Sequence, residues 1–431
     1  MLSAEDNALI TQTSKGTPMG ELFRRFWLPV LLPEELPEPD CPPIRIKVMG
    51  EYLVAFRDTN GRVGLVEAFC PHRRAPLFYG RNEECGLRCV YHGWKFGVDG
   101  SCIDMPSEPA DSDFRAKVRI DAYPVQEWGG VIWVYMGPPE HMPATPPQLE
   151  WALVSPAQRR VTKNFQECNY LQALEGDIDT AHVSYLHSSK VRLPQNQGVV
   201  RDVGRIDKAP KLMVLSHDAG FAYGGRRTVP DGGYYWRVTQ FLWPTYAFIP
   251  AFSWPKTCTY TVPVDDHHCF RMGFAYNIEG PMPEVGRWLQ PGDGIGPWSR
   301  TYGQYWFDDG LAIDTWLLDQ NKRNHYFMDR EKQRTESFTG ITGIPTQDRA
   351  MTEGMGFICD RTKERLGTTD VAVIAARRGL IDMARNLERG IAPYCATNAA
   401  AYRLRALDVV TPDGDLAPVL ERYKDEIAVT L

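Results

Sequence analysis

The chain has 431 residues, enough for two or three domains, and its 43% hydrophobic and 24% charged content is that of a folded globular protein. Its formal net charge of -6, from 48 basic and 54 acidic residues, argues against nucleic acid as the main partner, because phosphate binding is usually driven by a basic surface. No run of about 18 apolar residues occurs, and the acidic N-terminus MLSAEDNALI fits neither a secretory signal nor a transit peptide. We therefore expect a cytoplasmic protein with no membrane partner, in which Cys grouped with His would indicate a metal site.

The first third of the chain predicts mainly β-structure. Residues 1–40 are expected to form a helical and connecting segment that ends in the Pro-rich sequence PEELPEPDCPP. The runs IRIKV, EYLVAF and VGLVEAF then alternate with a period of two, and Asn60-Gly61 between the last two predicts a type I′ hairpin turn. A further strand is expected over 129–137, and PPEHMPATPP (138–147) predicts a boundary.

The rest of the chain mixes the two periodicities. Strands are expected over 234–243 and in YTVPV and CFRMGFAYNI. Helices are expected over 308–323 (DDGLAIDTWLLDQNKR) and over 370–389, where Asp370 is the expected N-cap and Gly390 marks the end. The predicted fold class is α+β, with an all-β domain over 41–147 and a larger domain over 148–431 that contains an antiparallel sheet.

The clearest motif is a repeated pairing of Cys with His. Cys70-Pro-His72 is followed, after sixteen residues, by Cys89-Val-Tyr-His92, and both pairs come just after predicted strands. Zinc sites usually group two Cys and then two His. The order found here instead suits a Rieske [2Fe–2S] cluster, with two Cys on one iron and two His on the other. A structural zinc site is the alternative.

These loops carry a family resemblance. CPHRRAPL (70–77) and CVYHGWKF (89–96) resemble the two cluster-binding loops of Rieske non-haem iron oxygenases. Two imidazole ligands raise the reduction potential to roughly -150 to +300 mV, against about -400 mV for plant-type clusters, so such a cluster accepts electrons readily.

A second constellation lies in NYLQALEGDIDTAHVSYLH (169–187), which holds Asp179, His182 and His187. Two His and one carboxylate form the facial triad that binds Fe(II) and leaves positions open for oxygen. On a helix, Asp179 and His182 share a face, whereas His182 and His187 are about 140° apart. The two His can therefore converge on one ion only if the helix is distorted or ends between them. Two unrelated surface histidines are the alternative.

This segment closely resembles the iron-binding helix of the phthalate-dioxygenase-like branch of the same family. The resemblance implies that Asp179 is not a ligand, and that it links a Rieske His of a neighbouring subunit to an iron-ligating His; Asp177 and Glu175 are the competing acids. It places the third iron ligand at Asp348, within GIPTQDRAMTEGMG (343–356). Glu353 and Asp360 are the alternatives.

The resemblance also implies the activity and the partners. It indicates an oxygenase component with a helix-grip-like catalytic domain, which activates O2 at mononuclear Fe(II) with electrons from the Rieske cluster, and which forms a homotrimer or stacked trimers. The only glycine cluster, at 292–296, lacks a preceding strand and a following helix, so no bound flavin or NAD is expected. A separate NADH-dependent flavin and iron–sulfur reductase is therefore the expected partner.

The sequence indicates the substrate less closely than it indicates the metal sites. This branch acts mostly on aromatic carboxylates, and a buried Arg is the natural partner of a carboxylate. Arg237 and Lys211 are the candidate substrate contacts. The resemblance also indicates that phthalate-acting members of this branch often have Arg at the position of Lys211 and Ser at the position of Ala181. These two differences favour a substituted benzoate over a dicarboxylate as the substrate.

Three hypotheses follow for the activity. The favoured one is cis-dihydroxylation of a benzoate-type ring. Within the same family, O- or N-demethylation is the alternative. An electron-transfer or structural metal protein is the alternative of another class, and it leaves the second His pair and the downstream Asp without a role.

Overall fold

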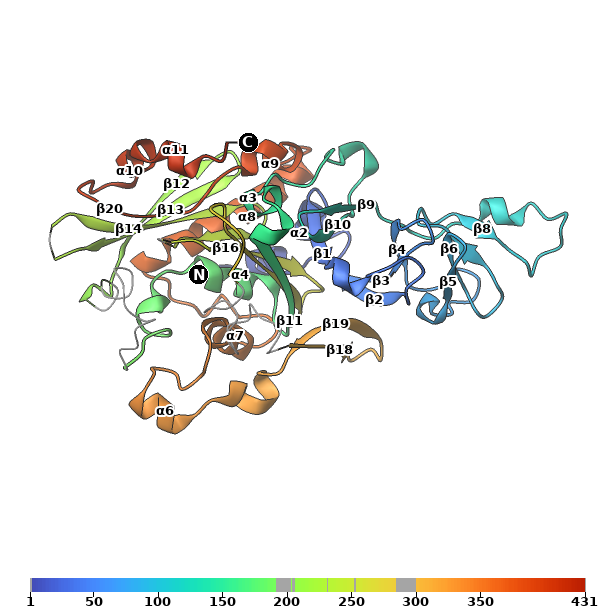
Figure 1. Ribbon diagram of the computed structural model, residues 1–431, viewed down its shortest axis with the longest axis horizontal. Helices are drawn as coiled ribbons and strands as arrows, with labels where there is room; N and C mark the ends of the chain where they lie inside the picture. Colours follow the sequence, from blue (N-terminus) through green and yellow to red (C-terminus); the bar gives the residue numbers. More distant parts are fainter. Residues whose placement is uncertain are drawn as a thin grey trace.

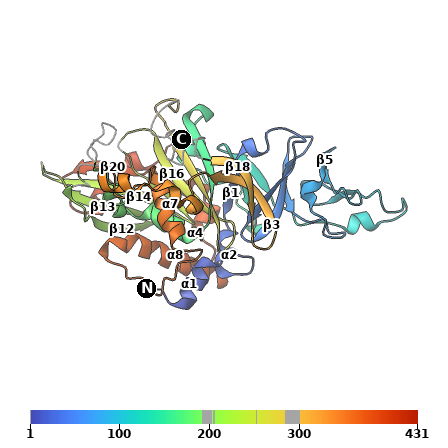
Figure 2. The same cartoon turned by 90° about the horizontal axis from the view of Figure 1, so that it is seen from below.

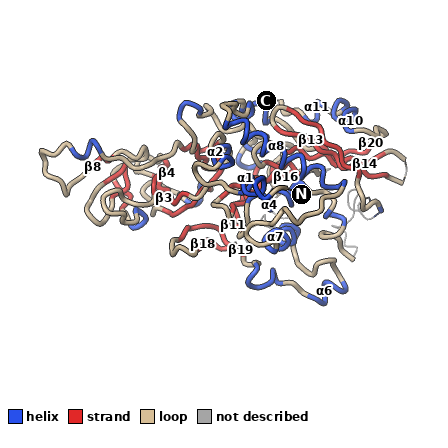
Figure 3. Tube along the Cα trace, turned by 180° about the vertical axis from the view of Figure 1, so that it is seen from behind, coloured by secondary structure: helices blue, strands red, loops and turns tan. Residues whose placement is uncertain are grey.

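The computed structural model describes residues 2–190, 203, 206–230, 232–251, 253–283 and 300–430. Figure 1 shows an elongated molecule in which a smaller, all-β domain projects from a larger α+β domain. Figure 3 shows that helices are concentrated in the larger domain. Within the described ranges, no helix is long and apolar enough to span a membrane. The glycine cluster at 292–296 lies outside the described residues.

The N-terminal segment belongs to both domains. Helices α1 (Ala4–Thr11) and α2 (Pro18–Phe23) contact α8 (Val371–Glu388) of the larger domain, beside which they lie in Figure 2. Strand β1 (Trp27–Leu31) pairs with β10 (Val131–Tyr135), which pairs with β9 (Val125–Trp128). The predicted connecting segment therefore packs as part of the core, with its first half on the larger domain.

Two more antiparallel sheets complete the small domain. The first contains β2 (Ile44–Val48), β3 (Glu51–Arg57) and β4 (Val63–Glu67), and the second contains β5 (Arg81–Glu83), β6 (Gly86–Arg88), β7 (Lys95–Phe96) and β8 (Cys102–Asp104). The predicted strands before and after Asn60-Gly61 are confirmed, but the type I′ turn is wrong. The loop has five residues, only Gly61 has a positive φ, and the carboxylate of Asp58 accepts from the N–H groups of Asn60 and Arg62.

The larger domain is built on one antiparallel sheet. Its strands run in the order β11 (Arg159–Gln166), β17 (Cys269–Tyr276), β16 (Lys256–Pro263), β15 (Tyr246–Ile249), β14 (Tyr234–Leu242), β13 (Gly220–Thr228) and β12 (Lys211–His217), and β20 (Leu407–Thr411) also pairs with β14. A Cβ on Gly379 of α8 would meet the ring of Trp243, just past β14, at 2.2 Å, whereas Leu416 of α10 (Leu416–Arg422) contacts Gly224 of β13. Helix α8 therefore packs closely on one side of the sheet and α10 on the other (Figure 1).

The predicted helix over 308–323 is wrong, because most of it forms a hairpin. Strand β18 (Arg300–Trp306) pairs with β19 (Ala312–Leu318) across a turn in which Gly310 has a φ of 79°. Strand β19 packs against β11 of the larger domain and β2 of the small domain. Because β19 is covered on both sides, most of its residues are apolar, and this dense apolar content led to the helix prediction. The helix predicted over 370–389 is confirmed as α8, with Asp370 at its N-cap.

Short elements complete the fold: η1 (Pro33–Glu35), η2 (Leu77–Tyr79), η3 (Phe114–Lys117), η4 (Pro139–His141), α3 (Glu150–Leu153), η5 (Pro156–Gln158), α4 (Tyr170–Ile178), η6 (His182–Ser184), η10 (Lys322–Phe327), α6 (Arg330–Thr335), α7 (Ile344–Gly354), η11 (Thr368–Asp370), α9 (Tyr394–Thr397), η12 (Ala399–Tyr402) and α11 (Lys424–Ile427).

A buried ion pair joins the N-terminal segment to the main sheet. Lys163 of β11 lies with its Nζ 3.0 and 3.2 Å from the two carboxylate oxygens of Glu35, and neither side chain is exposed. Burial raises the pKa of Glu35 and lowers the pKa of Lys163, in spite of their mutual attraction. Removing either partner would therefore leave an uncompensated charge in the protein interior.

Replacing Glu35 by Gln should lower the free energy of unfolding by about 3–5 kcal/mol, because the ammonium of Lys163 would stay buried without its counter-charge. The shift in the urea midpoint measures this effect. The double variant with Met at positions 35 and 163 should lose much less, since it buries no charge. A loss below about 1 kcal/mol in the single variant, which is the value of an exposed pair, would mean that water reaches the ammonium.

Candidate metal centres

The two Cys-His loops of the small domain share one backbone design. In the first, the N–H of Arg74 donates to the carbonyl of Cys70 at 2.8 Å, and the N–H of Cys70 donates to the carbonyl of Ala75 at 2.9 Å. In the second, Gly93 donates to the carbonyl of Cys89 at 2.9 Å, and Cys89 donates to that of Trp94 at 2.8 Å. The fourth residue after each Cys has a positive φ, 59° at Arg74 and 79° at Gly93. Both loops therefore turn back at the same point, four residues after their Cys.

Within these loops the thiols are buried and the imidazoles lie further out. Cys70 and Cys89 are 2% exposed, whereas His72 is exposed and His92 half-buried. Burial raises the pKa of Cys70 to about 12, and the neighbouring thiol of Cys89 adds to the shift. The rings of His72 and His92 lie 4.4 Å apart between centroids. Two adjacent buried sulfurs with two imidazoles beside them fit a [2Fe–2S] cluster that has its His-bound iron nearer the surface.

The segment of the larger domain that is predicted to bind iron begins where helix α4 ends. Asn169 caps the start of α4, and Asp179 is its C-cap, with extended backbone angles of -87° and 124°. His182 opens the short η6 helix, and His187 lies beyond it. The chain has therefore left the α-helix before either His, which removes the 140° divergence expected on a continuous helix.

Helix α7 brings the third side chain from far along the sequence. It begins after Gly343, which has a φ of 92°, and carries Asp348 in its second turn. Asp348 Oδ1 lies 3.4 Å from His182 Nε2 and 3.1 Å from His187 Nε2, and the two Nε2 atoms are 3.1 Å apart. The ligand atoms all lie within 4.8 Å of one another. The structure thus brings together the three residues predicted as iron ligands.

The polar contacts around the triad leave its lone pairs facing one another. His182 Nδ1 faces Asp179 Oδ2 at 3.2 Å, and His187 Nδ1 faces Gln347 Oε1 at 2.7 Å. With a metal bound, each imidazole can donate its Nδ1 hydrogen outward and direct the lone pair of Nε2 at the centre. Two such lone pairs and a carboxylate oxygen repel one another unless a metal ion or a proton lies between them. This donor set fits Fe(II) in a two-His, one-carboxylate site.

The electrostatics of the site point the same way. Although burial favours the neutral ring, the carboxylates of Asp179 and Asp348 raise the pKa of His182 to about 10. Burial alone would raise the pKa of Asp348, but the two imidazoles hold it well below its usual range. The site therefore carries a negative potential that favours a bound cation.

The competing acids have other partners. Asp177 binds Arg271 and the hydroxyl of Thr259, and Glu175 binds Arg361 and Arg377. Glu353 is buried, where its carboxylate accepts from the N–H of Glu167 and from Tyr326. Asp360 is exposed and binds Thr362 and Lys363. Of the acids considered from the sequence, only Asp179 and Asp348 contact an iron-site His.

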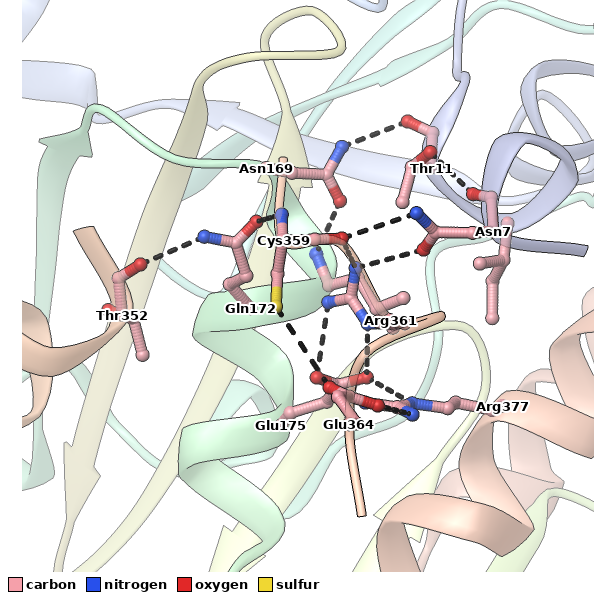
Figure 4. Close-up of polar contacts among 12 residues, drawn as sticks. Asn7, Thr11, Asn169, Gln172, Glu175, Thr352, Cys359, Arg361, Glu364 and Arg377 are labelled. Atoms are coloured by element: carbon pink, nitrogen blue, oxygen red, sulfur yellow. Dashed lines mark hydrogen bonds and ion pairs between the residues drawn. The ribbon is translucent and has the colours of Figure 1, made fainter. Parts of the chain in front are cut away.

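A buried polar network holds α4, which leads into the segment with His182, against the end of α7, which carries Asp348 (Figure 4). Gln172 of α4 donates to the carbonyls of Thr352 and Gly356 at the end of α7, at 2.9 Å each, and accepts from the N–H of Cys359 at 2.8 Å. One turn further along α4, Glu175 accepts from Arg361 and from Arg377 of α8. These contacts fix α4 against α7, and with them the spacing between the two His and Asp348.

The two predicted substrate contacts lie on opposite faces of the sheet. Arg237 of β14 is half-buried and pairs in register with Gly225, where an added Cβ would meet Thr180, two residues before His182. Lys211 pairs with Arg226, whose side chain is on the other face, and it is exposed. The structure therefore brings Arg237, but not Lys211, to the side of the sheet that faces the iron-binding segment.

Arg237 belongs to a cluster of charged and polar groups that also contains Arg227, Tyr235, Asp207 and Asp408. Arg227 is 3% exposed and donates to the carbonyls of Asp207 and Thr180. Asp408 is a carboxylate of the cluster, and it accepts from the hydroxyl of Tyr235 at 2.7 Å. Although burial opposes its charge, Tyr235 and Asp408 raise the pKa of Arg237, while burial raises the pKa of Asp408. Both guanidinium groups lie in the field of Asp408, and the carboxylate of Asp207 also acts on Arg227.

Comparisons with known proteins cover both domains. The family model of the Rieske [2Fe-2S] domain matches residues 26–124, and a model described as LigXa C-terminal domain like matches residues 134–415.

Full-length relatives agree with these matches. The oxygenase subunit of phthalate 4,5-dioxygenase from Pseudomonas putida is 40% identical over 90% of this chain and 88% of its own length. That of 3-chlorobenzoate-3,4-dioxygenase from Comamonas testosteroni is 35% identical over 93% of each chain. That of 5,5'-dehydrodivanillate O-demethylase from a Sphingobium strain is 31% identical over 91% and 83%.

Among solved structures, dicamba monooxygenase bound to dicamba matches with a TM-score of 0.56. The match has 18% sequence identity and covers 85% of this chain and 99% of the other. At that identity it supports the two-domain fold alone.

Proposed function

This chain belongs to the Rieske oxygenases, as an oxygenase subunit of the phthalate and benzoate dioxygenase branch, and from that premise we propose that it cis-dihydroxylates a substituted benzoate or a related aromatic carboxylate. The observation that carries the proposal is the convergence of His182, His187 and Asp348, with Arg237 on the same side of the sheet. Cys70, His72, Cys89 and His92 would hold the [2Fe–2S] cluster. When bound, the two metal groups supply the electrons and the activation of O2.

The residues around the iron triad prepare it for this task. His182, His187 and Asp348 are 21%, 8% and 22% exposed in their side chains, so the site is sheltered and still reachable. Asp179 accepts from the N–H of Ala181 at 2.7 Å, which orients its other oxygen toward His182 Nδ1. Burial opposes the charge of Asp179, but hydrogen bonds from His182 and two backbone N–H groups lower its pKa. Asp179 therefore stays ionised, and its Oδ2 can accept the Nδ1 hydrogen of His182.

The guanidinium of Arg237 supports an anionic substrate. A carboxylate that binds there would lie against a half-buried cation, and an Arg binds a carboxylate through two parallel hydrogen bonds. Because Lys211 lies on the opposite face, we leave it out of the proposed pocket.

Replacing Arg237 by Gln should raise the KM for a benzoate substrate at least about tenfold, since one charge-assisted hydrogen bond contributes roughly 1.5–3 kcal/mol. Steady-state kinetics with a surrogate reductase measure the effect. A neutral substrate such as benzamide is the control, and its KM should change much less. An unchanged KM for benzoate would place the carboxylate elsewhere.

Demethylation of a methoxyaromatic is the second candidate. The observation that favours it is the O-demethylase relative, which is 31% identical over 91% of this chain. The same metal ligands serve both reactions, so the position of the substrate relative to His182 and Asp348 would decide between them.

The proposed partners are a separate NADH-dependent reductase and two more copies of this chain. The small-domain loops and α7 lie in different parts of the molecule in both ribbon views (Figures 1 and 2), which favours electron transfer between subunits. Exposed apolar side chains surround both centres, as expected of subunit interfaces: Tyr79, Val90, Tyr91 and Phe114 beside the cluster loops, and Tyr185, Phe338, Met351 and Met355 beside the triad. A homotrimer would bring one surface against the other.

Product analysis tests the proposed function. The purified protein, a surrogate reductase, NADH and O2 are incubated with benzoates, phthalates and methoxybenzoates, and products are identified by mass spectrometry. A cis-dihydrodiol from a benzoate is the expected result. Formaldehyde with a phenol would favour demethylation, and the absence of any oxygenated product across the panel would overturn both.

A further inference from the structure

Beside the iron triad lies a glutamine with no role in the ligand set. Gln347 immediately precedes Asp348 in α7 and is 8% exposed. Its Oε1 lies 2.7 Å from His187 Nδ1, and its Nε2 donates to the carbonyl of Ile341 at 2.8 Å. No pattern in the sequence pointed to it, because its partner lies 160 residues earlier.

The contact with Ile341 determines which way the amide faces. A backbone carbonyl can only accept, so the NH2 group of Gln347 must point toward Ile341, and its oxygen must then point toward His187. An amide oxygen cannot donate, so the hydrogen of this bond belongs to Nδ1 of His187. The lone pair of His187 is therefore on Nε2, the atom that lies 3.1 Å from Asp348 Oδ1.

The two triad histidines are thus oriented by different groups. His182 donates to the carboxylate of Asp179, whereas His187 donates to a neutral amide. Two carboxylates already lie at the site, and an amide orients the second ring without adding a third. Because Gln347 and Asp348 are neighbours in one helix turn, a single element places both a ligand and the acceptor that orients another ligand.

We propose that Gln347 is a positioning residue that fixes the tautomer and ring orientation of His187, so that the affinity of the triad for Fe(II) depends on its amide. This inference rests on the proposed iron site. Partners of this kind typically contribute 10- to 100-fold to metal affinity, because the free ring would otherwise populate the wrong tautomer and rotate.

The test compares Fe(II) binding by three variants of the full chain with its cluster intact. Gln347→Leu removes the acceptor, Gln347→Glu keeps an acceptor for Nδ1, and Gln320→Leu removes an amide that binds Thr346 of the same helix without touching a ligand. The triad is emptied with a chelator, and Fe(II) is titrated back against a competing chelator. The visible absorption of the Rieske cluster reports that each variant is folded. Electron paramagnetic resonance of the nitric oxide adduct reports the symmetry of the iron coordination.

Gln347→Leu should bind Fe(II) roughly 10- to 100-fold more weakly than the wild type, with a changed resonance lineshape and an unchanged cluster spectrum. Gln347→Glu should recover most of the affinity, and Gln320→Leu should match the wild type. Wild-type affinity in Gln347→Leu, or equal losses in Gln347→Leu and Gln347→Glu, would overturn the inference. A wild-type protein that binds no Fe(II) at the triad would instead overturn the proposed function.

Discussion

Replacing His182 by Ala should abolish turnover and empty the iron site while leaving the absorption of the Rieske cluster unchanged. His182 contributes one of three converging ligand atoms, and its Nε2 lies 3.1 Å from that of His187. Two ligands would remain, too few to hold Fe(II) in a facial triad. The cluster ligands belong to the other domain, in loops whose hydrogen bonds include no residue near His182. Iron per chain, the visible spectrum and product formation are measured on the same preparation.

A matched control for His182→Ala is His267→Ala. His267 is an exposed histidine of the same domain, stacked on Phe357 and outside the triad. It should keep both metal contents and full turnover. Loss of the cluster together with the iron in His182→Ala would contradict two independent centres, and retained turnover would contradict the assignment of His182 as a ligand.

Replacing Asp179 by Asn should lower turnover by about 10- to 100-fold or more, with both metal centres still loaded. Asn keeps the size of the side chain and an oxygen for the N–H of Ala181, but it loses the charge that holds the hydrogen of His182 Nδ1. If Asp179 also accepts a hydrogen bond from a Rieske His of a neighbouring subunit, electron transfer between the centres will slow by a similar factor. Stopped-flow oxidation of the reduced cluster, with substrate and O2 present, measures that step directly.

Asp360→Asn provides the control for this variant. It removes an exposed carboxylate whose side-chain contacts, within the described residues, are with Thr362 and Lys363. It should oxidise its cluster at the wild-type rate. If Asp179→Asn also oxidised at that rate, the link between the centres would run elsewhere, and if it lost its iron, Asp179 would be a ligand or essential to the triad.

Local patterns were sufficient for much of the fold. Alternation predicted β2 to β4, and a helical stripe with Asp370 before it and Gly390 after it predicted α8. The same kind of pattern failed over 308–323, where β19 is apolar because two domains cover it. Apolar content shows that a segment is buried, but not by what, and only the packing distinguishes a buried strand from a helix.

The candidate ligands of both proposed metal centres could be named from the sequence alone, because Cys-His pairs and a two-His segment are local and chemically specific. What the tertiary structure decided is how they meet. Helix α4 ends at Ile178, before either His, and α7 carries Asp348 to them from more than 160 residues away. The tertiary structure also distinguished Asp348 from the other acids. It placed Lys211 on the face of the sheet opposite Arg237, and it brought Gln347 against His187. Convergence on one point depends on where helices end and what they pack against, and those distances are not contained in spacing along the chain.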